Sequence, residues 1–186
     1  GAGAITCGGA FALMTGSATV QAPATLQVTA TNNLAAAVSQ GQSIVPVMRL
    51  TFTAAGATVQ NNSFTLHFRD GSDNPVNAYG TIDKVYVYNG SETFATTISA
   101  DPTTGFTVAD TSAKRWIAPG TPVNYDFTAD LNASAAAGTV FRLQLSDSTQ
   151  VTALDSNTQQ AVDTLTLGAT PLCSAAAAIQ TKALLT

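Results

Sequence analysis

The residue types that support catalysis are sparse in this chain, and their spacing forms no known catalytic group. His67 is the only histidine, and it falls on the polar side of an alternating run, between Thr65 and Arg69. A Ser-His-Asp hydrolase would have to use this imidazole, yet no serine or cysteine stands at a nucleophile spacing from it. The eleven acidic residues are spread over turns and strand edges, and a paired-acid site needs a cleft that spacing alone does not supply. The sequence therefore predicts no enzyme and no catalytic residue.

Patterns that would hold a metal ion are also missing. Asp70, Asp73 and Asn74 share one turn and could offer oxygens to Ca²⁺, but the stretch does not match an EF-hand loop. Aspartate and asparagine are also the residues that β-turns recruit. Cys7 and Cys173 have no second cysteine or histidine at ligand spacing, which argues against zinc. We expect no metal site and no cofactor.

Cys7 and Cys173 lie near opposite ends of the chain and predict a disulfide formed in an oxidising compartment. Within one subunit the bond would tie the two ends together and stabilise the fold by roughly 4–5 kcal/mol in the chain-entropy model. Between subunits it would join the N-terminal arm of one copy to the tail of the next. Two separate buried thiols are the alternative.

Three aromatic residues are candidates for sugar stacking. Tyr86 and Tyr88 fall on one face of an alternating run, and Trp116 lies in a loop before Pro119-Gly120. Flat aromatic rings with a polar edge suit such contacts, although they are equally ordinary in cores and protein interfaces. A carbohydrate-binding or adhesive module is therefore the second functional class that the sequence supports.

Three Asn-x-Ser sequons are candidate glycosylation sites. They begin at Asn61, Asn89 and Asn132, and all fall at predicted turns or strand edges. A glycan needs an acceptor on the surface of a secreted protein. Sugars there would also make up for the small number of surface charges.

Charge is the scarcest property of the composition. Seven basic and eleven acidic side chains are the only charged ones in 186 residues, whereas a typical domain is about a quarter charged. Alanine (33) and threonine (29) fill a third of the chain. The net charge of −4, with scattered basic residues, argues against nucleic acid and anionic membranes as partners. No apolar run reaches the roughly 18 residues of a membrane-spanning helix.

Alternation with a period of two dominates the middle of the chain and predicts antiparallel strands with one buried face. The clearest runs are residues 48–52, 64–68, 123–127 and 141–145. Turn signals separate the runs, and Asn89-Gly90 predicts a tight hairpin. About eight such strands indicate an all-β antiparallel β-sandwich, jelly-roll or immunoglobulin-like, over residues 17–167.

Both ends differ from this body. Residues 1–16 form a glycine-rich, uncharged arm that contains the apolar stretch Ala10, Phe11, Ala12, Leu13 and Met14, and residues 168–186 form a tail with one charge. Exposed apolar ends are an aggregation hazard. An extended segment can instead add itself as a strand to the open sheet of another subunit. The alternative is that both ends pack on their own sandwich.

The body resembles extracellular β-sandwich filament subunits of prokaryotes that assemble by donor-strand complementation, such as archaeal bundling pili and bacterial biofilm-matrix fibres. The resemblance rests on loose β-strand patterns at residues 45–52, 82–88, 117–123, 126–131 and 139–143. It implies subunits threaded head to tail, with an N-terminal segment completing the neighbouring sandwich. It carries over no functional residue, and it does not predict Cys7 or Cys173.

Together these observations predict a structural subunit of an extracellular filament or surface layer. Its partners would be copies of itself, with surface glycans as a further candidate, and with no nucleic acid and no membrane insertion. Gly1-Ala2-Gly3 suggests a mature N-terminus after removal of a leader peptide, so we expect a cell-surface location. A viral capsid or spike protein is a further alternative.

Overall fold

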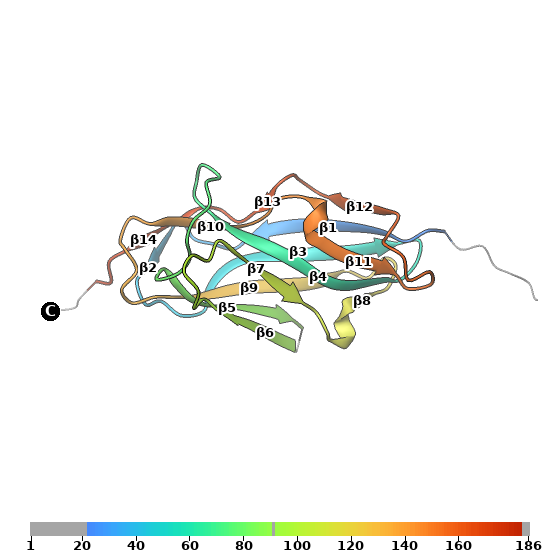
Figure 1. Ribbon diagram of the computed structural model, residues 1–186, viewed down its shortest axis with the longest axis horizontal. Coiled ribbons are helices and arrows are strands. Elements are labelled where there is room, and N and C mark those ends of the chain that lie inside the picture. Colours follow the sequence, from blue (N-terminus) through green and yellow to red (C-terminus); the bar gives the residue numbers. More distant parts are fainter. Residues whose placement is uncertain (1–21, 91, 184–186) are drawn as a thin grey trace, which may run out of the picture.

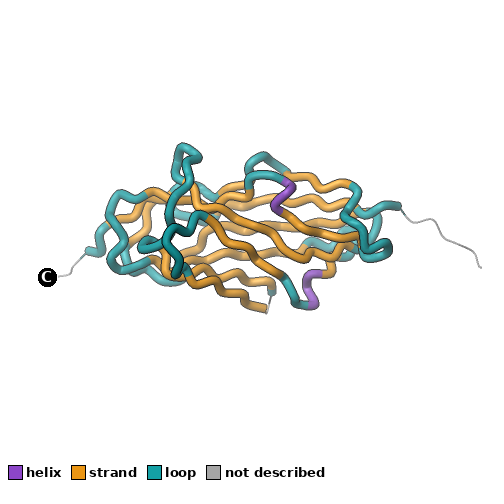
Figure 2. Tube along the Cα trace, viewed as in Figure 1, coloured by secondary structure: helices purple, strands orange, loops and turns teal. Residues whose placement is uncertain are grey.

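Two β-sheets pack face to face, and most of their strands run along the long axis of the molecule (Figure 1, Figure 2). The computed structural model describes residues 22–90 and 92–183. The first sheet has six strands, in the spatial order β12 (Thr164–Leu167), β1 (Thr25–Asn32), β3 (Val45–Ala55), β9 (Val123–Leu131), β5 (Ile82–Asn89) and β6 (Glu92–Thr97).

The second sheet has eight strands and is built around β4 and β10. Its main order is β11 (Val151–Asp155), β4 (Val59–Arg69), β10 (Val140–Leu145), β14 (Ala177–Gln180) and β2 (Ala37–Ser39). Three shorter strands complete it: β13 (Leu172–Cys173) on β10, and β7 (Gly105–Ala109) and β8 (Trp116–Ile117) on β4. The helical turns in the described residues are 3₁₀, at Ala113–Arg115 and Ser148–Gln150.

The all-β sandwich predicted from alternation is confirmed. The strand pairs are mostly antiparallel, but β1 with β12 and β14 with β2 are parallel. Alternation reports which face of a strand is buried and is blind to the direction of the neighbouring strand, so it did not distinguish these two pairs. The predicted hairpin at Asn89-Gly90 is also confirmed, with Asn89 opposite Glu92 and Gly90 at φ +64°.

An aromatic cluster fills the space between the sheets. The predicted inward positions of β3, β4, β9 and β10 are almost all buried, as their alternation requires. Phe52, Phe64, Tyr125 and Phe127 lie with neighbouring ring centroids 5.0–6.1 Å apart, mostly edge to face. Such pairs add to the stabilisation that burial of the rings already provides.

The C-terminal segment belongs to the sandwich, which corrects the predicted boundary at Leu167. β14 pairs with both β10 and β2, and its Ala177 and Ile179 side chains are buried in the core. The segment is short and rich in alanine, so its alternation was too weak to be recognised as a strand. The boundary predicted between residues 16 and 17 lies outside the described residues.

The two ends of the sandwich are distinct. The described chain starts at one end of the long axis and finishes at the other (Figure 1). We call the end that contains Ala22, Gly56 and β8 the arm end. We call the opposite end, where Gln40 N–H donates to the Gln180 carbonyl at 2.9 Å, the tail end.

Candidate functional site

The outer face of the six-stranded sheet carries a hydrogen-bonded polar patch. Arg49 on β3 donates two hydrogen bonds to Asp126 on β9, with nitrogen–oxygen distances of 2.7 and 3.0 Å. Further along β9, Asp130 accepts the Tyr86 hydroxyl at 3.1 Å, and this bond raises the pKa of Tyr86. The rings of Tyr86 and Tyr88 lie 6.4 Å apart, with their planes at 20°. They therefore share the outer face of β5, as the alternation predicted.

A shallow groove of about 370 Å³ lies at the arm end beside Trp116. β8 places Trp116 opposite Gln60 of β4, and its side chain is 42% exposed. The guanidinium of Arg115 lies 5.6 Å from the centroid of the indole ring. Asn124 and Asp126 of β9 are also among the groove residues. An aromatic ring beside an amide and a carboxylate is a small binding surface of mixed character.

The three predicted sugar-stacking residues are only partly brought together. Trp116 borders the groove, and Tyr88 is the cross-strand partner of Asp126, which also borders it. Tyr86 lies one step further along β5, opposite Thr128. The groove and the tyrosine pair are therefore neighbours on one side of the molecule.

A buried polar network lies next to the groove and links the two sheets. Asp110, after β7, accepts hydrogen bonds from the Tyr125 hydroxyl and, at 3.0 Å, from Asn89 Nδ2. The Tyr125 hydroxyl in turn accepts Asn61 Nδ2 at 3.1 Å. All four side chains are buried, and burial, together with the bond to Asp110, raises the pKa of Tyr125. Sequence reasoning missed the network, because Tyr125 has the spacing of a core residue and Asp110 that of a turn residue.

The network overturns two of the predicted glycosylation sites. Asn61 and Asn89 are 0% and 2% exposed, and both amides donate hydrogen bonds inside the protein. A glycan cannot be accommodated on either side chain without opening the sandwich. Asn132 is half-buried at the tail end and donates to Asp83 at 2.7 Å, so it stays a prediction.

The described residues assemble no constellation around His67. The side chain is half-buried on β4, between Gln144 of β10 and Gly105 of β7, and no described group hydrogen-bonds to its ring. Across residues 22–90 and 92–183, no three His, Cys, Asp or Glu side chains gather in a way that could hold a metal ion. Asp70 accepts the N–H groups of Ser72 and Asn74 and therefore forms its own turn. These bonds, with the Asn74 side-chain bond first, lower the pKa of Asp70.

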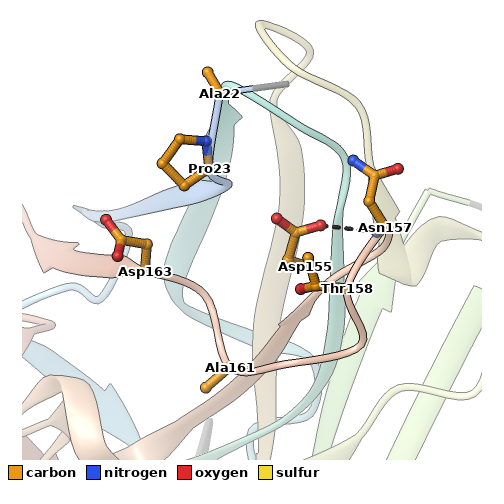
Figure 3. Close-up of a pocket in the computed structure, with 7 residues that line it drawn as sticks. All are labelled: Ala22, Pro23, Asp155, Asn157, Thr158, Ala161 and Asp163. Atoms are coloured by element: carbon orange, nitrogen blue, oxygen red, sulfur yellow. Dashed lines mark hydrogen bonds between the residues drawn. The ribbon is translucent and has the colours of Figure 1, made fainter. Parts of the chain in front are cut away.

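A second hollow, of about 590 Å³, opens at the arm end where the chain enters β1 (Figure 3). Asp155 and Asp163 line it together with Pro23. The Asp155 carboxylate accepts the N–H of Asn157 at 2.7 Å and of Ala24 at 3.2 Å, and these bonds lower the pKa of Asp155. Asp155 therefore fastens the start of β1 to the loop after β11, which is a structural role.

Several predicted residues lie outside the part of the chain that is described. They are Cys7 and the candidate donor-strand residues Ala10, Phe11, Ala12, Leu13 and Met14. Cys173 is a half-buried free thiol on β13. The disulfide and the donor strand both stay predictions.

Ile44, at the tail end, is a feature that sequence reasoning missed. Its side chain is 62% exposed, and its backbone adopts φ +54°. A β-branched residue rarely adopts this left-handed conformation, which glycine and asparagine tolerate better. The Ile44 N–H donates to Asp130 Oδ1 at 2.7 Å, which holds the strained backbone in place. No local motif in the sequence signals this conformation.

Comparison with known proteins gives a broad structural likeness only. No protein-family model matches the chain, and no curated protein matches it in sequence. One similar structure is the seventh ScaB type I cohesin from Pseudobacteroides cellulosolvens, which is 12% identical to this chain. The match covers 87% of this chain and 94% of the cohesin, with a TM-score of 0.37. The sixth cohesin of Acetivibrio cellulolyticus scaffoldin B, solved with a Cel5 dockerin, is 14% identical at 86% and 99% coverage, with a TM-score of 0.36.

CaCohA2 from Clostridium acetobutylicum is similar to the same degree, with 13% identity, 86% and 92% coverage and a TM-score of 0.31. Identity and TM-score are both too low to transfer a binding partner to this chain. The part of the predicted resemblance that holds is the β-sandwich itself. Within the described residues, no helix is long and apolar enough to span a membrane.

Proposed function

We propose that this protein is a structural subunit of an extracellular filament whose copies join head to tail. An N-terminal segment containing Ala10, Phe11, Ala12, Leu13 and Met14 would add to the sheet of the next copy as a donor strand. The location of the protein would be extracellular or at the cell surface, after removal of a leader peptide. The alternatives of a surface layer and a viral capsid share the assembling role and differ in symmetry.

The observation that carries the proposal is the separation between the start and the finish of the described chain. The described chain enters the sandwich at the arm end and finishes at the tail end (Figure 1). Because β14 is paired on both sides within its own sheet, the C-terminal segment is not available as a donor. The segment before Ala22 is therefore the better donor, and residues 15–21 can span at most about 23–25 Å when extended.

The sandwich also offers acceptor edges. β12 and β6 are the outermost strands of the six-stranded sheet, and the residues of both are almost all uncharged. Their inward-facing Leu165, Leu167 and Phe94 side chains are only partly buried against the core. Soluble proteins usually protect such edges with charges, proline or bulges. An added strand would pair the free backbone groups and cover these side chains.

Electron microscopy of the full chain beside a chain lacking residues 1–16 tests the proposal. We expect filaments from the full chain and none from the truncated one. Identical fields of single particles would overturn the proposal, and closed shells would indicate a capsid.

A matched pair of variants tests strand donation itself. In a strand, Phe11 and Leu13 share one face and Ala12 lies on the other. Phe11→Asp with Leu13→Asp should therefore abolish filaments, whereas Ala12→Asp should reduce them much less if its face points to solvent. Equal loss from both variants would indicate that the segment does not bind as a strand.

A disulfide between Cys7 and Cys173 of adjacent copies would lock such a filament. Non-reducing electrophoresis of filaments should then show a ladder of covalent multimers that dithiothreitol collapses to one band. A single monomer band without reductant would overturn the disulfide between copies but would not contradict the filament.

Sugar binding at the Trp116 groove is the second candidate function. It is favoured by the placement of Asn124 and Asp126 beside the exposed indole ring. Titration calorimetry with neutral oligosaccharides would detect it, and Trp116→Ala should abolish the signal. Tyr79→Ala is the matched control, since Tyr79 is similarly exposed, at 47%, and does not border this groove.

A further inference from the structure

The large apolar side chains that remain exposed in the described chain are confined to the two ends of the sandwich. They are Ile44 (62%), Tyr79 (47%) and Trp116 (42%). Ile44 lies at the tail end, where its neighbour Gly41 donates to the Asn132 carbonyl. Asn132 in turn donates to the Thr81 carbonyl, which brings the Tyr79 loop to the same end. Trp116 lies at the arm end, so apolar surface is presented at both ends of the long axis.

Ile44 is held outward by a specific arrangement. Its left-handed backbone is fixed by the hydrogen bond from its N–H to Asp130 Oδ1 at 2.7 Å, and Asp130 Oδ2 is engaged by the Tyr86 hydroxyl at 3.1 Å. The strain is not offset by burial of the side chain, which faces solvent. Strained backbone that persists without a packing benefit suggests a functional site.

The groove beside Trp116 is a suitable receptor for such a side chain. Its volume of about 370 Å³ exceeds that of one aliphatic side chain, and its lining combines Trp116 with Ala118, Pro122 and Val123. An aliphatic group inserted there would contact the indole ring and the proline.

We propose that Ile44 of one copy docks into the Trp116 groove of the next copy. The two contact surfaces differ and lie at opposite ends, so the contact is heterologous and repeats into an open filament instead of closing a dimer. The described chain begins at Ala22, at the same end as the groove, so a copy docked there would be the one within reach of the arm that precedes Ala22. The inference rests on the proposed filament and names its second contact.

The variant Ile44→Asn separates this role from a structural one. Asparagine tolerates positive φ better than isoleucine, so the monomer should unfold at the same or a higher temperature. The protein concentration needed for filament formation should nevertheless rise at least about tenfold, because the burial of one aliphatic side chain is lost. Thr29→Asn, on the exposed outer face of β1, is the matched control and should change neither measurement.

Crosslinking between copies locates the contact directly. One population would carry Ser43→Cys, beside Ile44, and the other Thr121→Cys, on the groove; both positions are exposed. With Cys7 and Cys173 replaced by serine, a short bis-maleimide should join the two populations into heterodimers within filaments. Ser43→Cys mixed with Thr29→Cys should give no such product.

The outcomes distinguish this inference from the proposed function. The docking contact would be overturned, and the filament would stand, if the Ile44→Asn variant formed filaments as well as the wild-type chain. The same conclusion would follow if no crosslink formed between Ser43→Cys and Thr121→Cys within filaments. A wild-type chain that forms no filaments would overturn both. If Trp116→Ala abolished oligosaccharide binding while filaments assembled unchanged, the groove would be a sugar site and the docking contact would be wrong.

Discussion

The arm end and the tail end belong to the same two sheets but are held together by different interactions. Near the arm end, Tyr125 joins the aromatic cluster on one side and the buried network with Asp110 on the other. At the tail end, comparable links lie at the surface, such as the bond from Ile44 to Asp130. Buried polar networks are strong when complete and costly when one member is lost. Rigidity should therefore be concentrated near the arm end, while the tail end should tolerate substitution.

The largest effect is expected in the aromatic cluster. Phe64→Ala should lower the free energy of unfolding by about 3–5 kcal/mol, because it leaves a cavity between the sheets. At the tail end, Ile179→Val in β14 should cost only about 0.5–1.5 kcal/mol. Chemical denaturation of both variants measures the difference, and equal losses would contradict the contrast.

The next effect concerns the polar network. Tyr125→Phe removes the hydroxyl that donates to Asp110 and accepts from Asn61. Leaving the buried Asn61 amide without its acceptor, and Asp110 with one donor fewer, should cost about 1–3 kcal/mol. Tyr86→Phe removes a hydroxyl from the half-exposed outer face and is the control, which should cost less. An unchanged free energy of unfolding in Tyr125→Phe would show that the network adds no stability.

A smaller effect is expected from the tail end. Asp130→Ala removes the acceptor for both the Ile44 N–H and the Tyr86 hydroxyl. We expect a loss of about 1 kcal/mol by thermal unfolding, since both bonds lie near solvent. The Tyr86 pKa should also fall toward its ordinary value in a spectrophotometric titration, because the bond that raises it is gone.

The smallest effect is a pH dependence at the arm end. The pKa of Asp155 is lowered in the folded protein, chiefly by the Asn157 N–H. Its stabilising contribution is therefore present above the unfolded pKa of about 3.9 and is lost as the pH falls through the lower folded value. In Asp155→Asn, the free energy of unfolding should therefore fall less between neutral pH and about pH 3 than it does in the wild-type chain. An unchanged acid profile would show that Asp155 does not fasten β1.

The candidate site was only partly accessible from the sequence. Trp116, Tyr86 and Tyr88 could be selected by residue type, and the shared face of the two tyrosines followed from the period of two. The groove beside Trp116 could not be predicted, because its lining comes from β8, the loop that follows it, the start of β9 and the Asn89-Gly90 turn, which only the fold brings together. The burial of Asn61 and Asn89 was likewise hidden, because a sequon reports chemistry and not exposure.

The sequence by itself determined the class of fold and the inward face of the main strands. Phe64, Leu66 and Phe68 are buried because alternate side chains of a strand point to the same side. The low charge is also a property of the sequence alone, as is the tight hairpin at Asn89-Gly90. These features depend on neighbours in the chain.

Only the tertiary structure decided which residues meet across long separations. Asp110 accepts the Tyr125 hydroxyl, which in turn accepts the Asn61 amide, so the network joins strands of both sheets. The positive φ of Ile44 is held by its bond to Asp130, 86 residues away. The parallel pairing of β14 with β2 likewise joins the last described strand to one of the first. Such contacts depend on the packing of the two sheets and not on any local pattern. The opposite placement of the first and last described residues, on which the proposed assembly depends, has the same origin.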